Sequence, residues 1–299
     1  MKQLRAQLKN KEFSKMYLFT GEEKYLMDVY KKRYLDTIFQ GQDQMMNCDQ
    51  FNQDNKDIDR IESSLETLPF FADKRVVVLE NLDLFNKKNK TRNERITDSL
   101  KNLSDTTICI ILEDKLDKRN RLYKLVKKEG LIHEFTFLSE RELIQYVARE
   151  LKKADIKIST GDAKYLIDTV GYELRSITKE VSKLVDYAGD AQVVTGQDID
   201  AVCTKHLEAK IFELVDAIGL KKRERALNLY NDMISLREPT QRILFMITRQ
   251  ISLIYQGKLL TAKKAHQSQI AKELKVPDFV ARKIIGQGNQ FSLDSIKAI

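Results

Sequence analysis

The sequence has little that interrupts regular secondary structure. Its 299 residues include only 3 prolines, 11 glycines and no tryptophan. Because proline and glycine are the residues that most often end helices and strands, this scarcity excludes a long flexible linker and favours continuous elements. No internal repeat of fixed period and no low-complexity tract occurs.

Cysteine and long apolar runs are also scarce. The three cysteines, Cys48, Cys109 and Cys203, are odd in number and far apart, so they define neither a disulfide framework nor a zinc site. No run of about eighteen apolar residues occurs, and the polar start of the chain does not look like a secretion signal. We therefore expect a protein of the reducing cytoplasm, with no membrane association.

Length and charge limit the architecture and the partners. A chain of 299 residues with 42% hydrophobic residues exceeds what one core usually serves, so we expect two or three domains. Lys and Arg number 52 against 44 Asp and Glu, a net charge of +8. This modest excess favours an acidic or polyanionic partner, although most single charges are expected to be the solvated faces of helices.

The first 137 residues alternate short apolar runs with helical patterns, which predicts a parallel sheet wrapped by helices. The expected strands are Met16 to Thr20, Met45 to Phe51, Arg75 to Leu79, Thr107 to Leu112 and Leu131 to Phe135. One helix is expected from Glu23 to Ile38. In another, Ile58, Ile61, Leu65 and Leu68 recur at helical spacing and predict a face turned to the core.

Beyond Phe137 the pattern becomes helical, starting with the capping-box spacing of Ser139 and Glu142. We expect helices over Glu140 to Ala154, Gly161 to Val170 and Glu173 to Ala188, a capped helix from Thr195 through Val202, and long amphipathic helices from Glu208 onward. The fold class is therefore α/β then all-α, with predicted domains 1–137, 138–207 and 208–299. The last residues, from Ser292, read as a helix that has just started, so the natural chain is expected to continue.

The predicted sheet lacks the phosphate-binding loop that often follows the first strand of such a fold. That loop needs the pattern GxxxxGK[ST], but the three positions that follow Gly21 at this spacing are Leu26, Met27 and Asp28. The apolar strand before Glu80 ends in a single carboxylate followed by Asn81, which cannot restore a magnesium site. The three histidines lie in different predicted elements. We therefore expect no catalytic, cofactor-binding or metal-binding residues.

The most basic stretch of the chain runs from Lys115 to Lys128. Its cations could contact a nucleic-acid backbone, with Lys118, Arg119, Arg121 and Lys124 as the candidates. The favoured interpretation is instead that Leu122, Leu125 and Val126 pack inward and leave the cations as the solvated side of an ordinary helix. The stretch supports an alternative function, that of a basic helical DNA-binding or regulatory protein.

Two adjacent aromatic residues follow a proline between the striped helix and the next strand. Pro69 disfavours helical geometry at Leu68, so a turn should carry Phe70 and Phe71. Two neighbouring rings in a short turn do not easily enter the same core, and an exposed pair is a typical anchor of a protein interface. The rings could also plug the gap between helix and sheet, and spacing alone does not decide.

Three segments together resemble the delta subunit of the bacterial DNA polymerase III clamp loader. They are Tyr17 to Leu26 (YLFTGEEKYL), Leu68 to Val78 (LPFFADKRVVV) and Ile211 to Ile218 (IFELVDAI), and the second is the most specific. The resemblance spans essentially the whole chain. It implies a degenerate AAA+ module without a P-loop, a small helical lid and a helical collar.

The resemblance also implies a function and partners. The hydrophobic pair of that family enters a pocket on the beta sliding clamp, which assigns this role to Phe70 and Phe71, with Leu68 and Pro69 shaping the approach. The chain would open the clamp for loading on primed DNA during replication. It would be a non-catalytic subunit, without ATPase activity, of the DNA polymerase III holoenzyme, a DNA-directed DNA polymerase and nucleotidyltransferase. Its other partners would be loader subunits of the gamma or tau type and the delta prime type. The family's collar usually runs some tens of residues further than this chain.

Overall fold

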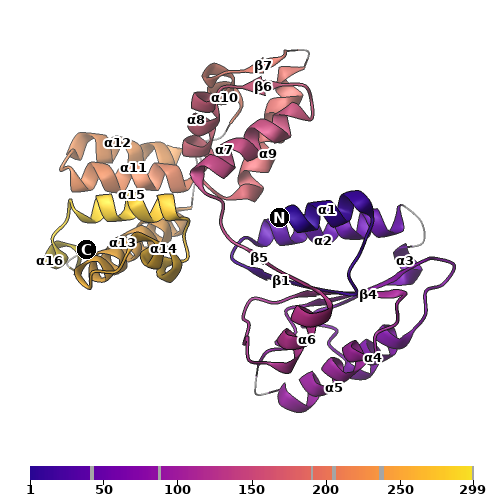
Figure 1. Ribbon diagram of the computed structural model, residues 1–299. Coiled ribbons are helices and arrows are strands. Elements are labelled where there is room, and N and C mark those ends of the chain that lie inside the picture. The colour runs from indigo at the N-terminus through magenta and orange to yellow at the C-terminus, as the bar shows by residue number, and fades with distance from the viewer. Residues whose placement is uncertain (41–43, 87–88, 190, 204–206, 236–238, 298–299) are drawn as a thin grey trace. The chain divides into compact units, whose positions relative to one another are not determined.

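The structure, a computed structural model, describes residues 1–40, 44–86, 89–189, 191–203, 207–235 and 239–297 (Figure 1). The chain divides into two compact units, Met1–Thr136 and Phe137–Ile299. The first is α/β and the second is helical apart from two short strands, which confirms the predicted fold class. The predicted division of the helical part between residues 207 and 208 stays a prediction.

A five-stranded sheet forms the centre of the first unit. Its strands are β1 (Met16–Gly21), β2 (Cys48–Phe51), β3 (Arg75–Glu80), β4 (Thr107–Leu112) and β5 (Leu131–Phe135). They lie in the order β2-β3-β4-β1-β5, and every neighbouring pair is parallel. The residues of β4 are all buried, as is typical of a parallel strand covered on both faces. All five predicted strands are present.

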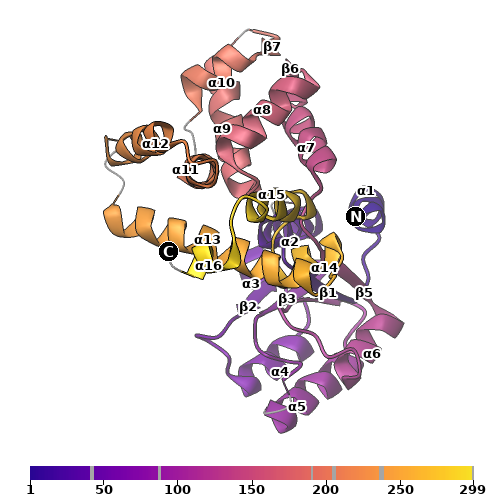
Figure 2. The same ribbon diagram turned by 90° about the vertical axis from the view of Figure 1, so that its left-hand side faces the viewer.

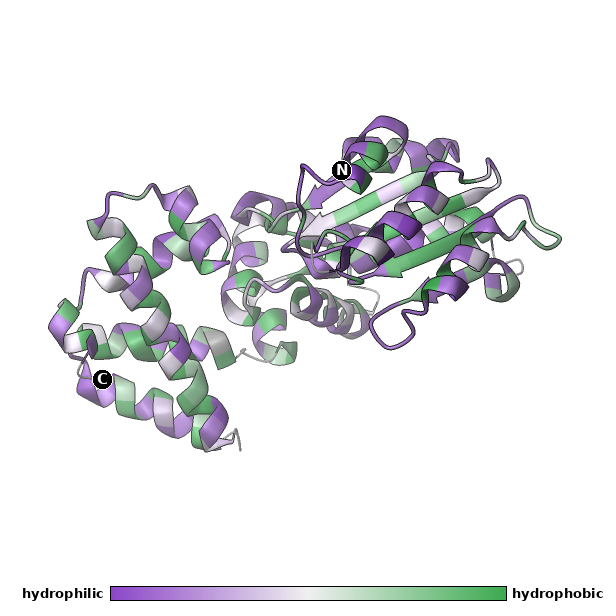
Figure 3. Cartoon of the chain, turned by 90° about the horizontal axis from the view of Figure 1, so that it is seen from below, coloured by the Kyte–Doolittle hydropathy of each residue, from purple (hydrophilic) through white to green (hydrophobic). Residues whose placement is uncertain are grey.

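Helices cover both faces of this sheet. Figure 1 shows α1 (Lys2–Asn10) and α2 (Lys24–Phe39) on one face, and α4 (Ile58–Glu66), α5 (Lys90–Lys101) and α6 (Arg121–Glu129) on the other. Coloured by hydropathy in Figure 3, strands of the sheet are mainly hydrophobic, whereas the helices carry both colours. The core of the unit is therefore the two layers between the sheet and its helices.

Two details of this unit differ from the sequence prediction. The expected strand from Met45 begins only at Cys48, because Gln44–Asn47 forms a short helix, α3. Leu68 was expected on the core-facing stripe, yet α4 ends at Glu66 and Leu68 is 66% exposed. The reason is local: Thr67 is already extended, with φ −67° and ψ 133°, and Pro69 excludes helical geometry at Leu68.

The second unit is built from helices. They are α7 (Glu140–Lys152), α8 (Thr160–Val170), α9 (Leu174–Ala188), α10 (Gly196–Val202), α11 (Leu207–Gly219), α12 (Arg223–Ser235), α13 (Thr240–Ala262), α14 (Gln267–Leu274), α15 (Asp278–Gly288) and α16 (Leu293–Lys297), with β6 (Lys157–Ile158) and β7 (Val193–Val194) as a short parallel pair. The long helix α13 is seen along its length in Figure 2. The predicted capping boxes at Ser139 and Thr195 are confirmed. In the described part of the chain, no helix has the length and apolar character needed to cross a bilayer.

Glycine is required where β1 ends, at the carboxyl edge of the sheet. Gly21 has φ +121°, and a Cβ at this position would lie 2.1 Å from the carbonyl oxygen of Phe135. Both the backbone geometry and the close approach to β5 exclude a side chain. Gly21 thus brings the start of α2 against β5, where Glu23 N–H donates to Phe135 O at 3.0 Å.

A buried carboxyl group lies at the same edge, one residue beyond β4. The side chain of Glu113 accepts a hydrogen bond from Leu84 N–H at 3.0 Å. Burial nevertheless dominates and raises the pKa of this carboxyl to about 7, because the charged form loses its water. Glu113 therefore carries a proton in much of the folded population near neutral pH.

Replacing Gly21 by alanine should destabilise the fold. We expect Gly21→Ala to lower the free energy of unfolding by more than about 1 kcal/mol, because the added Cβ collides with the backbone of β5. The matched control is Gly286→Ala in α15, where nothing lies within 4 Å of an added Cβ. Urea unfolding of both variants tests this, and an equal effect at the two positions would contradict it.

The pH dependence of stability should change when Glu113 is replaced by glutamine, which has no proton to release. The folded chain holds a proton that the unfolded chain releases. The contribution of Glu113 to the free energy of unfolding therefore falls as the pH rises from about 4.5 to about 7. We expect Glu113→Gln to raise the melting temperature above pH 7 and to change it little below pH 4.5. Glu134→Gln, at an exposed position on β5, is the control. A melting curve of Glu113→Gln that follows the parent chain at every pH would refute the interpretation.

Candidate protein-binding site

An apolar turn projects from the first unit between α4 and β3. In this turn, residues Leu68–Phe71, Phe70 is 54% exposed and Phe71 is 87% exposed. The two rings pack edge to face, with their centroids 4.6 Å apart. Consecutive exposed apolar side chains differ from the scattered single ones of ordinary surfaces and mark an interaction site. The spacing left open whether the two rings are exposed or fill the gap between helix and sheet. The structure shows that they are exposed.

The backbone at Phe71 is held in an unusual conformation. Its φ is +48°, in the left-handed region that non-glycine residues seldom occupy. Such a residue costs on the order of 1–3 kcal/mol and persists only when its surroundings impose it. Strain of this kind gathers at functional sites.

Asn47, the last residue of α3, holds the backbone of Phe70, the residue before Phe71. Its buried side chain pairs with the backbone of Phe70 in both directions: Phe70 N–H donates to Oδ1 at 2.6 Å, and Nδ2 donates to Phe70 O at 2.9 Å. An amide side chain thus replaces the strand partner that a turn residue lacks. Phe70 is fixed at its backbone while its ring stays exposed.

Arg75, the first residue of β3, joins the elements around the turn. Its guanidinium donates to Ser64 O of α4 at 3.1 Å, to Met46 O of α3 at 3.2 Å, and to the carboxylate of Asp49 on β2. Because the guanidinium is planar and carries five donors in a fixed arrangement, these three bonds also fix the angles between the elements. The turn is therefore anchored at both ends.

The turn lies at the amino-terminal edge of the sheet. The parallel register pairs Cys48 with Val76, so the residues just before β2 and β3 meet at this edge. Sequence reasoning missed Asn47 and Arg75 as supports, because each acts through partners 11 to 29 residues away. No local pattern identifies such contacts.

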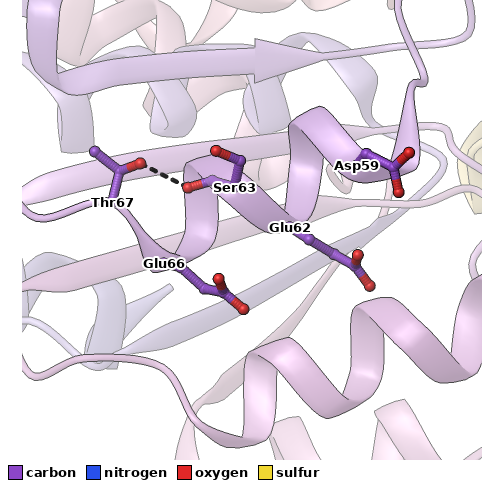
Figure 4. A pocket seen from close by; sticks show the side chains of 5 residues that line it. All are labelled: Asp59, Glu62, Ser63, Glu66 and Thr67. Atoms are coloured by element: carbon purple, nitrogen blue, oxygen red, sulfur yellow. Dashed lines mark hydrogen bonds between the residues drawn. The ribbon is translucent and has the colours of Figure 1, made fainter.

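A shallow acidic cavity of about 440 Å³ adjoins the turn along α4. It is lined by Asp59, Glu62, Ser63, Glu66 and Thr67, whose side chains are drawn in Figure 4. Thr67 Oγ1 donates to Ser63 O at 2.6 Å, and Arg95 of α5 pairs with Asp59 at 2.7 Å. Its lining residues come from a single helix and the residue after it. The cavity is the acidic flank of the apolar turn.

An internal ion pair occupies the edge where a nucleotide would bind in a P-loop protein. Lys31 Nζ lies 2.9 Å from Glu80 and 3.4 Å from Asp28. Burial lowers the pKa of Lys31, but its hydrogen bond to Glu80 and the two nearby carboxylates outweigh burial and raise it. Leu26 and Met27, at the P-loop positions, are buried. The carboxylate at the end of β3 is thus neutralised from within the chain.

The basic candidates lie on the surface before and along α6. Lys118, Arg119, Arg121 and Lys124 are all exposed, while Leu122 and Val126 are buried in the core and Leu125 packs against it. Arg119 pairs with Asp117 at 3.2 Å and Arg121 with Asp98 at 2.7 Å. The structure agrees with a solvated helix face, and DNA contact by these residues stays a prediction. Across the described ranges, no group of His, Cys, Asp and Glu could hold a metal ion.

The second unit carries an apolar groove of about 500 Å³, formed by α11, α12 and α13. It is lined by Leu214, Ala217, Ile218, Lys221, Arg223, Ala226, Leu227, Tyr230 and Ile247. On α13, Leu244 and Phe245 are also exposed. Helices of a monomer normally bury such side chains, so this surface is a second candidate for a protein partner.

Comparisons with known proteins agree with this architecture. A family model of the DNA polymerase III delta subunit matches residues 17–136, and one of its C-terminal domain matches residues 208–299. DNA polymerase III subunit delta of Bacillus subtilis (strain 168) is 28% identical, over 98% of this chain and 86% of that protein. A probable subunit delta of Aquifex aeolicus (strain VF5) is 27% identical, over 83% of this chain and 72% of that protein.

A solved structure extends the likeness to three dimensions. The Bacillus subtilis DNA clamp loader delta protein matches with a TM-score of 0.78 and 27% identity, over 99% of this chain and 89% of that chain. The match agrees with the predicted fold class, a domain with a parallel five-stranded sheet followed by helical parts. The chain belongs to the family of the DNA polymerase III delta subunit.

Proposed function

We propose that this chain is a clamp-loader subunit that binds the beta sliding clamp through Phe70 and Phe71 and favours its open form for loading on primed DNA. The observation that carries the proposal is the turn itself, with two exposed rings on a backbone held rigid from both sides. Family membership supports the partner, because clamp loading is the work of the family that the sequence resembles.

The turn is suited to binding with little loss of entropy. Burying one ring contributes roughly 1.5–3 kcal/mol, and aromatic anchors dominate the binding energy of protein interfaces. Because Asn47 and Arg75 already order the backbone, little further ordering is needed on binding. Leu68 and Pro69 flank the rings and shape the approach to the pocket on the partner.

Ring opening requires no chemistry from this chain. A binding protein shifts a two-state equilibrium only by its differential affinity, so the turn must fit the open clamp better than the closed one. To move a clamp from mostly closed to mostly open takes a preference on the order of 10⁴-fold. Clamp binding by this subunit is therefore the step that shifts the clamp toward its open form.

The Lys31–Glu80 pair supports a non-catalytic role within the DNA polymerase III holoenzyme. A magnesium-bound nucleotide would have to displace Lys31 from Glu80 and find backbone donors where Leu26 and Met27 are buried. ATP hydrolysis is therefore assigned to neighbouring subunits of the gamma or tau type. Their nucleotide state would expose the first unit of this chain to the clamp in the cytoplasm.

Assembly with those subunits and one of the delta prime type is assigned to the second unit. Its groove between α11, α12 and α13, with the exposed Leu244 and Phe245, presents apolar side chains of the kind that contacts between subunits bury. Thus the two surfaces divide the work: the turn engages the clamp, and the helical unit joins the loader.

Removing the rings should abolish clamp binding without disturbing the fold. We expect Phe70→Ala with Phe71→Ala to weaken clamp binding by about 2 kcal/mol or more, because both side chains are interface anchors and neither is buried in the core. Isothermal titration calorimetry with purified beta clamp measures this. An unchanged affinity would sink the proposal.

A double substitution on the helical unit should prevent assembly with the loader and leave clamp binding intact. We expect Leu244→Asp with Phe245→Asp to prevent assembly with the other loader subunits, because a charge on each side chain opposes burial in a contact. Gel filtration of the mixed subunits reports assembly, and the clamp titration should be unaffected. Loss of clamp binding in this variant, with assembly kept, would reverse the assignment of the two surfaces.

A further inference from the structure

We propose that Met45 and Met46 of α3 form a second part of the clamp-binding surface, beside the turn that carries Phe70 and Phe71. This inference rests on the proposed clamp binding of that turn. Met45 is 97% exposed and Met46 is 62% exposed, although methionine is ordinarily buried. Neither side chain stabilises the core of the first unit.

The two methionines and the turn are held as one piece. Asn47, the next residue along the chain, makes both hydrogen bonds to the backbone of Phe70. Arg75 donates to the carbonyl oxygen of Met46 at 3.2 Å and so ties α3 to the start of β3. A partner that seats the two rings therefore meets α3 at a fixed distance, with no hinge between them.

Methionine has the chemistry that a surface beside an anchor requires. Its unbranched, polarizable side chain adapts to irregular apolar surfaces, and methionine is enriched where proteins bind one another. With Leu68, Phe70 and Phe71, the two methionines make five exposed apolar side chains at one edge of the sheet. The rings suit a defined pocket, and the methionines suit the shallower apolar surface around it.

The charges beside this surface favour a protein over a lipid. Apolar residues that insert into membranes are accompanied by Lys and Arg, which attract anionic headgroups. Here the neighbouring cavity along α4 presents Glu66, while its Asp59 and Glu62 pair with Arg95 of α5. The lining of this cavity contains no cation that would attract anionic lipids, whereas an apolar pocket on a protein ring can bury the exposed side chains beside it.

Titration of the full chain with purified beta clamp tests the inference. We expect Met45→Ala with Met46→Ala to weaken clamp binding about tenfold, with the melting temperature unchanged because both side chains are exposed. The matched control is Gln44→Ala, an exposed polar residue of the same helix, which should bind like the parent chain. Unchanged affinity in the methionine variant overturns the inference.

A parallel titration of Phe70→Ala with Phe71→Ala separates this inference from the proposed function. If only the phenylalanine variant loses affinity, the clamp function stands and the methionine surface is refuted. If only the methionine variant loses affinity, the clamp contacts α3 but not the rings, so the assignment of the rings fails and the methionines are not an addition to it. If neither loses affinity, both are refuted, and loss in both supports both.

Oxidation footprinting gives a second readout that needs no substitution. Hydrogen peroxide transfers an oxygen atom to the methionine sulfur and leaves water, and exposed sulfurs react fastest. We expect the clamp to slow oxidation of Met45 and Met46 severalfold, as followed by mass spectrometry, with the partly exposed Met246 of α13 as the internal reference. Equal rates with and without the clamp would refute the contact.

Discussion

The candidate site depends on one side chain, the guanidinium of Arg75. It lies where β3 begins and holds α3, α4 and β2 through three separate acceptors. These acceptors lie on three elements that are separated along the sequence, so no local propensity brings them together. Because a buried guanidinium without partners is costly, the three elements and the charge stabilise one another. That arrangement positions α3 and the aromatic turn at this edge of the sheet.

The combination of exposed rings and a rigid backbone resolves a conflict between stability and binding. Two phenylalanines on a flexible loop would collapse onto the protein or lose much entropy on binding. The positive φ of Phe71 and the amide of Asn47 prevent both, at a cost in folding energy that the packed sheet below offsets. Strain at Phe71 is thus part of how the surface stays available.

Much of the fold is readable from the sequence, because buried parallel strands such as β4 are uninterrupted apolar runs. The short helix α3 is not, since two adjacent methionines before a strand fit the pattern of the strand equally well. The aromatic turn was located by Pro69, but its exposure was undecided until resemblance and then structure settled it. Asn47 and Arg75 could not be found, because their roles are tertiary contacts without a local signature.

The internal ion pair of Lys31 with Glu80 and the aromatic turn lie at opposite ends of the same strand, β3. Six residues of strand separate the two edges by roughly 20 Å. A partner bound at the aromatic turn and a contact at the carboxyl edge therefore do not compete for the same residues.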